Sequence, residues 1–169
     1  MNTCEVKIRR VRQGDARTLA YISTESWRAA FADILPEDLL GSLTEISKVE
    51  NMYAGLLDRN IGNGYILEAD GTAHCIAYWD NSRESDMAGY AELICIHSLQ
   101  DKWHMGYGSM MMEKVLQDIR AAGYEKVMLW VFKDNKRAIS FYEKHGFSAN
   151  GRSKEPLGTE EIMFEKALK

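Results

Sequence analysis

The most informative segment of the chain is residues 87–122, which read MAGYAELICIHSLQDKWHMGYGSMMMEKVLQDIRAA. It opens with an apolar run, Tyr90 to Ile96, that predicts a strand, and it closes with a helical repeat of apolar residues. Gly106 and Gly108 lie between the two. Glycines let the backbone turn tightly, and the first amides of a helix have no internal partner, so together they can bind a phosphate group. Two glycines at this spacing also occur in a plain strand-to-helix turn, so a second motif is needed to decide.

Length and composition predict a single domain over residues 1–169, since the chain has 169 residues and 46% of them are hydrophobic. No run reaches the ~18 consecutive apolar residues of a membrane span, and the first residues lack the apolar core of a signal peptide. We therefore expect a cytoplasmic protein with no membrane partner. The net charge of -4 gives no electrostatic basis for a nucleic-acid partner. Three cysteines without Cys-x-x-Cys spacing indicate neither a disulfide framework nor a metal site.

The rest of the chain predicts further helices and strands. Before the central segment, the patterns favour a strand at 5–11, a helix capped by Asp15 that ends near Phe31, a short helix from Pro36, a helical segment at 47–57 and a hairpin of strands at 65–69 and 74–79. After it, residues 126–132 form an almost unbroken apolar run, which is typical of a parallel strand covered on both faces. A short helix that ends at Gly146 and two strands, from Phe147 and over 161–164, complete the chain. These patterns predict a mixed sheet with a central β-α-β crossover.

A second motif makes the prediction specific. It is Asn135-x-x-Ala138-x-x-Phe141-Tyr142-x-x-x-Gly146-Phe147, and it follows the strand after the Gly106-x-Gly108 helix. The combination resembles the Gcn5-related N-acetyltransferase superfamily over roughly residues 65–164, and residues 11–31 are similar to that family's opening. The resemblance implies an α/β fold of the α+β mixed-sheet type. Its central sheet would have about seven strands, flanked by helices and splayed between strands four and five to admit acetyl-coenzyme A.

The resemblance also implies which residues contact the cofactor. Those that would pair their backbone with the pantetheine arm, like an added strand, are Ile96, His97 and Ser98. Those that would offer backbone amides to the pyrophosphate are Met105, Gly106, Tyr107, Gly108 and Ser109. Those that would line the cofactor from the other side are Asn135, Ala138 and Phe141. The family's loop usually begins with Gln or Arg three residues before the first glycine, and Trp103 occupies that place here. The resemblance therefore implies no side-chain contact with the cofactor from this position.

Two residues are candidates for the chemistry. An amine must lose its proton before it can attack a thioester, and the departing thiolate must gain one. By position, Glu92 looks like the base of the histone-acetylating branch of the family, and Tyr142 like its general acid. Each has a structural alternative, because Glu92 could simply bind a neighbouring side chain and Tyr142 could be a packing aromatic. His74, His97 and His104 are predicted to be structural or exposed, because nothing pairs them with a nucleophile.

The resemblance predicts an acetyl-coenzyme A-dependent N-acetyltransferase that acts on a small-molecule or peptide amine. Its acceptor side would be formed by the N-terminal helices and their loop, here Trp27, Phe31, Asp33, Ile34 and Glu37. Two alternatives remain. A dinucleotide-binding unit would need a third glycine where Met111 stands, and a non-catalytic domain that binds or senses acyl-coenzyme A would dispense with the acid and the base. A homodimer is possible, because dimers are common in the family.

Overall fold

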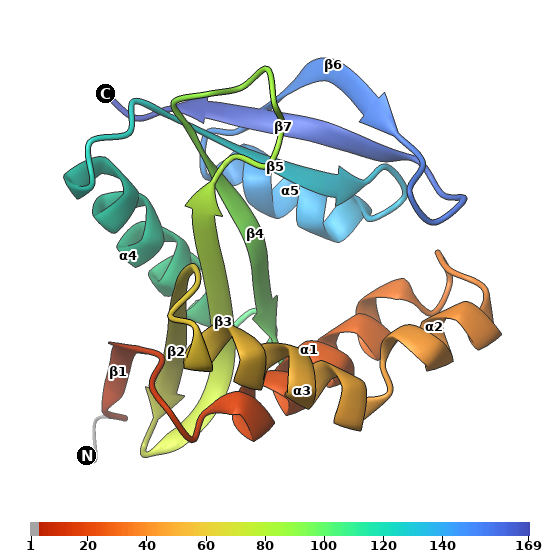
Figure 1. Cartoon of the computed structure of the whole chain (residues 1–169), viewed down its shortest axis with the longest axis vertical. Coiled ribbons are helices and arrows are strands. Elements are labelled where there is room, and N and C mark those ends of the chain that lie inside the picture. The colour runs from red at the N-terminus through yellow and green to blue at the C-terminus, as the bar shows by residue number, and fades with distance from the viewer. Residues whose placement is uncertain (1–3) are drawn as a thin grey trace.

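The computed structural model describes residues 4–169, and within them seven strands form one mixed sheet in the order β1-β2-β3-β4-β5-β7-β6 (Figure 1). The elements in chain order are β1 (Val6–Arg10), α1 (Ala16–Phe31), α2 (Glu37–Leu43), α3 (Ile46–Asp58), β2 (Asn63–Ala69), β3 (Thr72–Asn81), β4 (Tyr90–Ser98), η1 (Gln100–Lys102), α4 (Tyr107–Ala121), β5 (Lys126–Phe132), α5 (Lys136–Lys144), β6 (Ser148–Lys154) and β7 (Glu161–Ala167). The predicted α/β fold with a mixed sheet of about seven strands is therefore confirmed.

The sheet splits in its middle, between β4 and β5. These strands are parallel, and they pair only from Tyr90 opposite Lys126 to Glu92 opposite Met128. Beyond Glu92, β4 stays paired with β3, while β5 turns away and pairs with β7. Figure 1 shows the two halves of the sheet diverging, with β1 to β4 on one side of the gap and β5 to β7 on the other. The predicted splay between strands four and five is confirmed.

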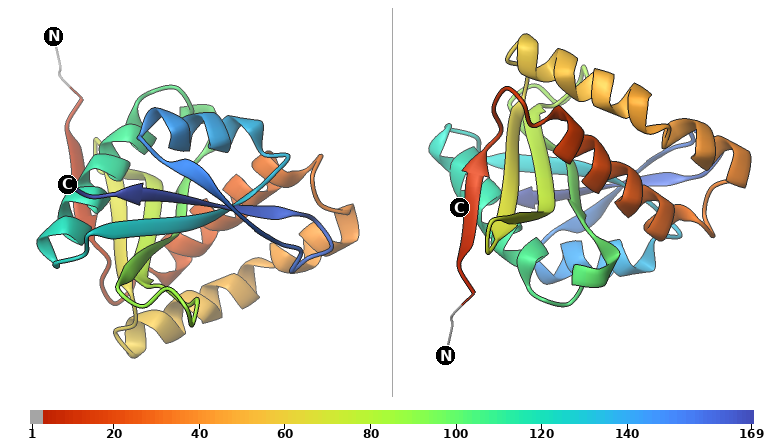
Figure 2. Two further views of the ribbon diagram at one scale, coloured as in Figure 1. Left: turned by 90° about the horizontal axis from the view of Figure 1, so that it is seen from above. Right: turned by 90° about the horizontal axis from the view of Figure 1, so that it is seen from below.

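Helices cover both faces of the sheet (Figure 2). On one face, α4 buries Met111, Met112 and Val115 in a core that also takes in the partly buried apolar side chains of α5. On the other face, Leu19 and Ile22 of α1 pack with residues of α3 against β2 and β3. Since α4 and α1 lie on opposite faces at the level of the split, the opening between β4 and β5 has a helix layer on each side.

The predicted hairpin turn is present, whereas the predicted cap of α1 by Asp15 is not. Asp70 and Gly71 connect β2 and β3 with φ angles of 49° and 78°, which is the left-handed pair that a tight hairpin turn requires. The predicted hairpin is therefore present. Asp15 stands at the start of α1, but its side chain makes no capping hydrogen bond. Its carboxylate instead accepts bonds of 2.8 and 3.0 Å from the guanidinium of Arg9, so its partner lies on a strand and not in the helix.

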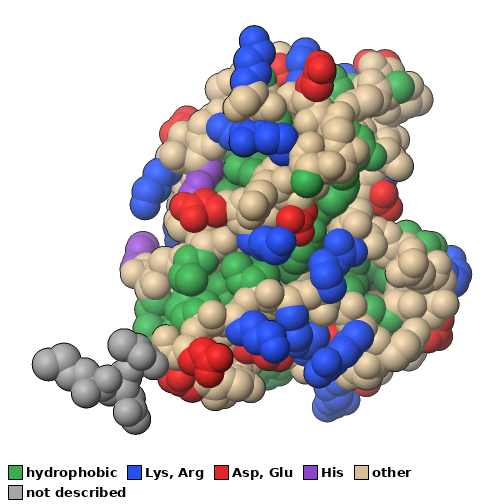
Figure 3. All heavy atoms as spheres, turned by 90° about the vertical axis from the view of Figure 1, so that its left-hand side faces the viewer, with side chains coloured by type: hydrophobic (Ala, Val, Ile, Leu, Met, Phe, Trp, Pro, Cys, Tyr) green, Lys and Arg blue, Asp and Glu red, His purple; other side chains and the backbone are tan. Residues whose placement is uncertain are grey.

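The surface drawn in Figure 3 carries Lys and Arg side chains interspersed with Asp and Glu side chains. No helix within residues 4–169 combines the length and the apolar character needed to cross a bilayer.

The absence of a nucleic-acid partner stays a prediction from the net charge.

Candidate active site

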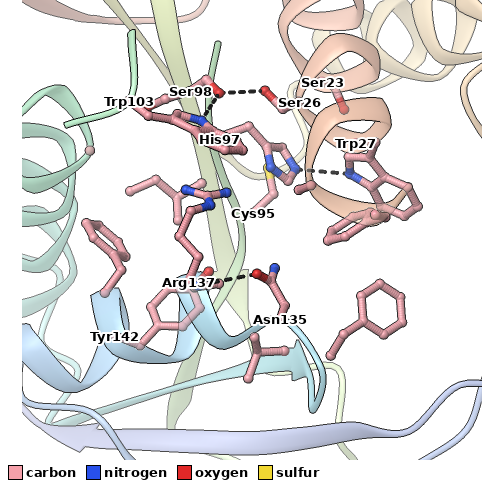
Figure 4. Close-up of a pocket in the computed structure, with 18 of the residues that line it drawn as sticks. Ser23, Ser26, Trp27, Cys95, His97, Ser98, Trp103, Asn135, Arg137 and Tyr142 are labelled. Carbon is pink, nitrogen blue, oxygen red and sulfur yellow. Dashed lines mark hydrogen bonds between the residues drawn. The ribbon is translucent and has the colours of Figure 1, made fainter. Parts of the chain in front are cut away.

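A cavity of about 720 Å³ occupies the split between β4 and β5. Its volume falls within the range of roughly 300–1,000 Å³ that is usual for small-molecule sites. Of the residues predicted to bind the cofactor or to carry the chemistry, all except Met105 and Glu92 line this cavity, and so do Trp27 and Phe31 of the predicted acceptor side. Figure 4 shows side chains reaching it from three directions: Trp27 from α1, His97 and Ser98 from β4, and Asn135, Arg137 and Tyr142 from α5 and the turn before it. The tertiary structure thus brings together residues that lie more than a hundred positions apart.

One end of the cavity is formed by the start of α4. Gly106 precedes the helix with a φ of 84°, a left-handed conformation that side chains disfavour, and no side chain caps the amides that follow. Gly108, in the first turn, faces the aromatic ring of Phe141, and a Cβ atom added there would lie 3.3 Å from that ring. The open amides and the bare backbone at Gly108 fit the pyrophosphate of coenzyme A, which needs donors and a close approach. Met105 lies just outside, with a side chain that is 55% exposed.

Trp103 contacts both the end of β4 and a side chain of α5. Its indole Nε1 donates a hydrogen bond of 3.0 Å to the carbonyl oxygen of Ser98, which ties the loop to the end of β4. The guanidinium of Arg137 stacks over the indole, 3.5 Å from the ring centroid. A guanidinium from α5 therefore lies beside the loop in which the family usually carries a Gln or Arg side chain. The same carbonyl of Ser98 also accepts a bond from Ser26 Oγ, so any further contact from Ser98 must use its amide or its hydroxyl.

The opposite end of the cavity is aromatic. The rings of Trp27, Phe31 and Phe132 follow one another edge to face, with centroids 4.9 Å apart in both pairs. Trp27 Nε1 also donates a hydrogen bond of 3.2 Å to His97 Nε2, which fixes the indole and places the proton of the neutral imidazole on Nδ1. Burial, with a contribution from Arg137, lowers the pKa of His97 to about 4. The imidazole is therefore neutral at physiological pH and serves to position Trp27.

The acceptor side differs from the prediction in one respect. Trp27 and Phe31 line the cavity, but Asp33, Ile34 and Glu37 do not. Ile34 instead packs with the apolar cluster around Phe31, and Glu37 lies in the first turn of α2. Because α1 ends at Phe31, the chain leaves the cavity wall directly after that residue. The acidic residues that come next, Asp33 and Glu37, therefore lie outside the cavity lining.

Tyr142 lies on the wall formed by α5. Its ring contacts those of Phe141 and Phe147, with centroid distances of 5.6 and 5.9 Å. Burial raises the pKa of its hydroxyl above the ordinary value of 10.0, so the hydroxyl stays protonated throughout the physiological range. A protonated hydroxyl that faces the cavity can donate a proton or a hydrogen bond.

Glu92, the predicted base, does not line the cavity. Its side chain is 2% exposed, and its carboxylate accepts three hydrogen bonds from Arg83: one from the backbone amide at 3.0 Å and two from the guanidinium at 3.1 and 2.6 Å. Burial raises the pKa of Glu92, but the bonds from Arg83 outweigh this and leave the pKa below its ordinary value. A carboxylate so engaged, and outside the cavity lining, is a poor proton acceptor. We therefore do not assign the base role to Glu92.

We expect Glu92→Gln to destabilise the fold. The amide would present an N–H group to Arg83 and would lose the negative charge that the three Arg83 donors face. Because the Arg83 side chain is 65% exposed, we discount the cost to about 1–2 kcal/mol. Since the pKa of Glu92 is lowered by folding, its contribution is present above the unfolded-state value of about 4.3 and is lost as the pH falls through the folded value. Urea unfolding at pH 4 and pH 7 measures both effects. Glu45→Gln, which removes a carboxylate from an exposed ion pair with Lys48, is the control, and an equal loss in both variants would contradict the assignment.

Four charged residues that line the cavity were not predicted from the sequence: Lys102, Arg137, Lys144 and Glu161. Arg137 lies inside the second motif, two positions after Asn135, so its position could have drawn attention to it. Glu161 gives no local signal, because it is an ordinary glutamate at the start of a strand. Only the pairing of β7 with β5, which sets Glu161 opposite Phe132, brings it to the cavity.

Comparisons with known proteins agree with this geometry. Residues 25–147 match the model of the acetyltransferase (GNAT) family. A curated relative, described as the uncharacterized N-acetyltransferase YuaI of Bacillus subtilis, is 25% identical over 142 residues, which cover 83% of this chain and 79% of the relative.

Two crystal structures show a similar fold. One is the PaiA N-acetyltransferase of Thermoplasma acidophilum in complex with coenzyme A, with a TM-score of 0.81 at 22% identity, over 96% of this chain and 99% of that one. The other, from Rhodopseudomonas palustris and described as a GCN5-related N-acetyltransferase, has a TM-score of 0.78 at 18% identity and covers 99% of both chains. From the family match and the site geometry together, the chain belongs to the acetyltransferase (GNAT) family and is an N-acetyltransferase that uses acetyl-coenzyme A.

Proposed function

We propose that this enzyme transfers the acetyl group to a primary amine, carried by a small molecule or by a peptide, through direct attack of the amine on the thioester. When bound, acetyl-coenzyme A supplies the activated acetyl group. The observation that carries the proposal is the difference in charge between the two ends of the cavity. Its phosphate-binding end has the open amides of α4 with Lys102, Arg137 and Lys144 among the lining residues, and its other end has aromatic walls and Glu161. An anionic cofactor and a cationic amine therefore each have a complementary end.

The protein's own groups suit these roles. The amides of Tyr107, Gly108 and Ser109 stand at the start of α4, where helix geometry leaves them without intrahelical acceptors. The hydroxyl of Tyr142 carries a proton at physiological pH, so its oxygen can supply one to the departing sulfur. The aromatic rings around Trp27 exclude water from the acceptor end, which keeps the reacting amine oriented and desolvated.

Thiol release from acetyl-coenzyme A tests the proposal. We expect the protein to release thiol with at least one member of a panel made of benzylamine, 1,5-diaminopentane, a peptide with a single lysine and a peptide with a free N-terminal alanine. Mass spectrometry should show that the acceptor has gained an acetyl group. Stabilisation by coenzyme A without thiol release in the presence of any of these amines would contradict the proposal and favour a binding or sensing role.

We expect Arg137→Met to weaken coenzyme A binding about tenfold, because a charge-assisted hydrogen bond to phosphate contributes roughly 1.5–3 kcal/mol and part of it can be replaced by Lys102 and Lys144. The weakening should shrink at high salt, since it is electrostatic. Titration calorimetry in low and high salt measures both effects. The matched control is Lys136→Met, which removes the same charge from the neighbouring residue, whose amine donates to a backbone carbonyl outside the cavity. Equal affinities of the two variants would contradict the role of Arg137.

Three further expectations stay predictions. The single domain over residues 1–169 is supported by the one sheet that all seven strands share. The cytoplasmic location and the homodimer depend on the sequence and the family alone. Size-exclusion chromatography with light scattering would test the homodimer directly.

A further inference from the structure

Glu161 is the only carboxylate among the described residues that line the cavity. It begins β7, where it pairs with Phe132 of β5 on one side and with Lys154 of β6 on the other. Phe132 belongs to the aromatic wall of the acceptor end, so the carboxylate lies at that end of the cavity. Within residues 4–169, its carboxylate oxygens have no hydrogen-bond donor and no ion-pair partner. A half-buried carboxylate of this kind remains free to bind a ligand.

The cations near Glu161 are held by other carboxylates. Arg83 is paired with Glu92 at 2.6 Å. Lys154 lies over the ring of Trp130, 4.1 Å from its centroid, with its amine 3.9 Å from Glu84. Glu84 in turn accepts a hydrogen bond of 3.0 Å from Trp130 Nε1, which fixes this arrangement. Arg83 and Lys154 are thus held by Glu92 and Glu84, and they act on Glu161 through their charge alone.

We propose that Glu161 receives the acceptor amine and acts as its base, an inference that rests on the proposed function. Its carboxylate attracts the ammonium group to the aromatic end of the cavity. A carboxylate oxygen then takes one proton, so that an N–H bond breaks, an O–H bond forms and the electron pair stays on nitrogen. The neutral amine is then able to attack the thioester carbonyl carbon. Trp27, Phe31 and Phe132 form the apolar surroundings in which this transfer takes place.

The electrostatic surroundings of Glu161 support this role. Burial raises the pKa of Glu161 above its ordinary value of 4.5, and Glu92 raises it further, while Lys154 and Arg83 oppose the shift. A base works best when its pKa is close to the working pH, so an upward shift favours proton transfer from an ammonium group. Among the described residues, the Lys and Arg side chains that line the cavity are Lys102, Arg137 and Lys144, and neither Arg83 nor Lys154 lines it. Among the described residues, no other carboxylate competes for the amine inside the cavity.

The test compares Glu161→Gln with Glu160→Gln, using the amine of the panel that gives the highest rate with the unmodified protein. Glu160 is the adjacent residue, and its carboxylate is bound by Lys133 at 2.7 Å outside the cavity. Both variants lose one negative charge, so a general electrostatic effect would appear in both. For Glu161→Gln, we expect kcat/KM at pH 7 to fall about tenfold to a hundredfold. The loss should shrink as the pH approaches the amine's own pKa, which is about 10 for a lysine-like acceptor. Glu160→Gln should resemble the unmodified protein.

A second measurement separates this role from a structural one. Thermal stabilisation by coenzyme A alone should be the same in Glu161→Gln and in the unmodified protein, and Glu161→Asp should recover part of the activity at low pH. A pH profile of Glu161→Gln that parallels that of the unmodified protein would overturn the inference, as would a loss of coenzyme A binding. Failure of the proposed function would be recognised separately, because the unmodified protein would then release no thiol with any amine of the panel.

Discussion

Gly108→Val is expected to abolish stabilisation by coenzyme A. A Cβ atom at this position already lies 3.3 Å from the ring of Phe141, and the two methyl groups of valine would extend into the space beside the amides of α4. The pyrophosphate then cannot approach the helix start closely enough to accept its hydrogen bonds. For the unmodified protein, coenzyme A at a hundred times its Kd adds about 2.7 kcal/mol of stability. That corresponds to roughly 5–10 °C in Tm for a chain of this size, and differential scanning fluorimetry should show no such shift for the variant.

Two further glycine variants make this result interpretable. Gly41→Val is the matched control, because Gly41 also lies in a helix and has no atom within 4 Å of an added Cβ. Its response to coenzyme A should be normal. Gly108→Ala should give an intermediate response, since the Phe141 ring needs to move by only a few tenths of an ångström. If Gly108→Val folds and gains as much Tm from coenzyme A as the unmodified protein, the cofactor does not bind at the start of α4.

Tyr142→Phe is expected to lower kcat by about one to three orders of magnitude while the affinity for coenzyme A stays nearly unchanged. This equals roughly 1.4–4 kcal/mol in the barrier, the contribution of a proton donor that acts only in the transition state. The phenyl ring keeps the contacts with Phe141 and Phe147, so packing is preserved. Single-turnover kinetics with the best amine of the panel measure the chemical step directly.

Tyr124→Phe, which removes a tyrosine hydroxyl outside the cavity, is the control for Tyr142→Phe. Tyr124→Phe deletes a hydroxyl that donates to the side chain of Asn81 and lies far along the sheet from the site, so its kcat should be unchanged. If Tyr142→Phe turns over as fast as Tyr124→Phe under conditions where chemistry limits the rate, Tyr142 has only a packing role. The proton would then reach the sulfur from another group or from water.

Together, Glu92 and Glu161 show how the surroundings of a carboxylate decide its role. Both are glutamates on strands of one sheet, Glu92 buried and Glu161 half-buried. Arg83 donates three hydrogen bonds to Glu92, which lowers the pKa of Glu92. Glu161 has no such partner among the described residues, and burial raises its pKa. Local sequence favoured Glu92, because its position resembles that of a known base. The pairing of Arg83 with Glu92 was not visible there, since it depends on how residues 82–86 return to the sheet.

The sequence by itself determined the features that follow from local patterns. Periodicity and glycine positions predicted the strands and helices and the open start of α4, because backbone conformation depends on residues close in the chain. The motif around Asn135 gave the family and thus the splayed sheet. Even the hairpin turn at Asp70 and Gly71 was predictable, since few residue pairs adopt its left-handed conformation.

Only the tertiary structure decided which charged side chains face the cavity. Arg137 reaches the phosphate-binding end because Trp103, from another segment, provides a surface on which its guanidinium stacks. Glu161 reaches the acceptor end because β7 pairs with β5. Within residues 4–169 its carboxylate has no ion-pair partner, since Glu84 and Glu92 hold the nearby cations. Even Asp15, at a helix start, pairs with Arg9 on β1 and not with its own helix. Charge pairing acts through space between distant segments, so the local sequence does not encode which partner a carboxylate finds.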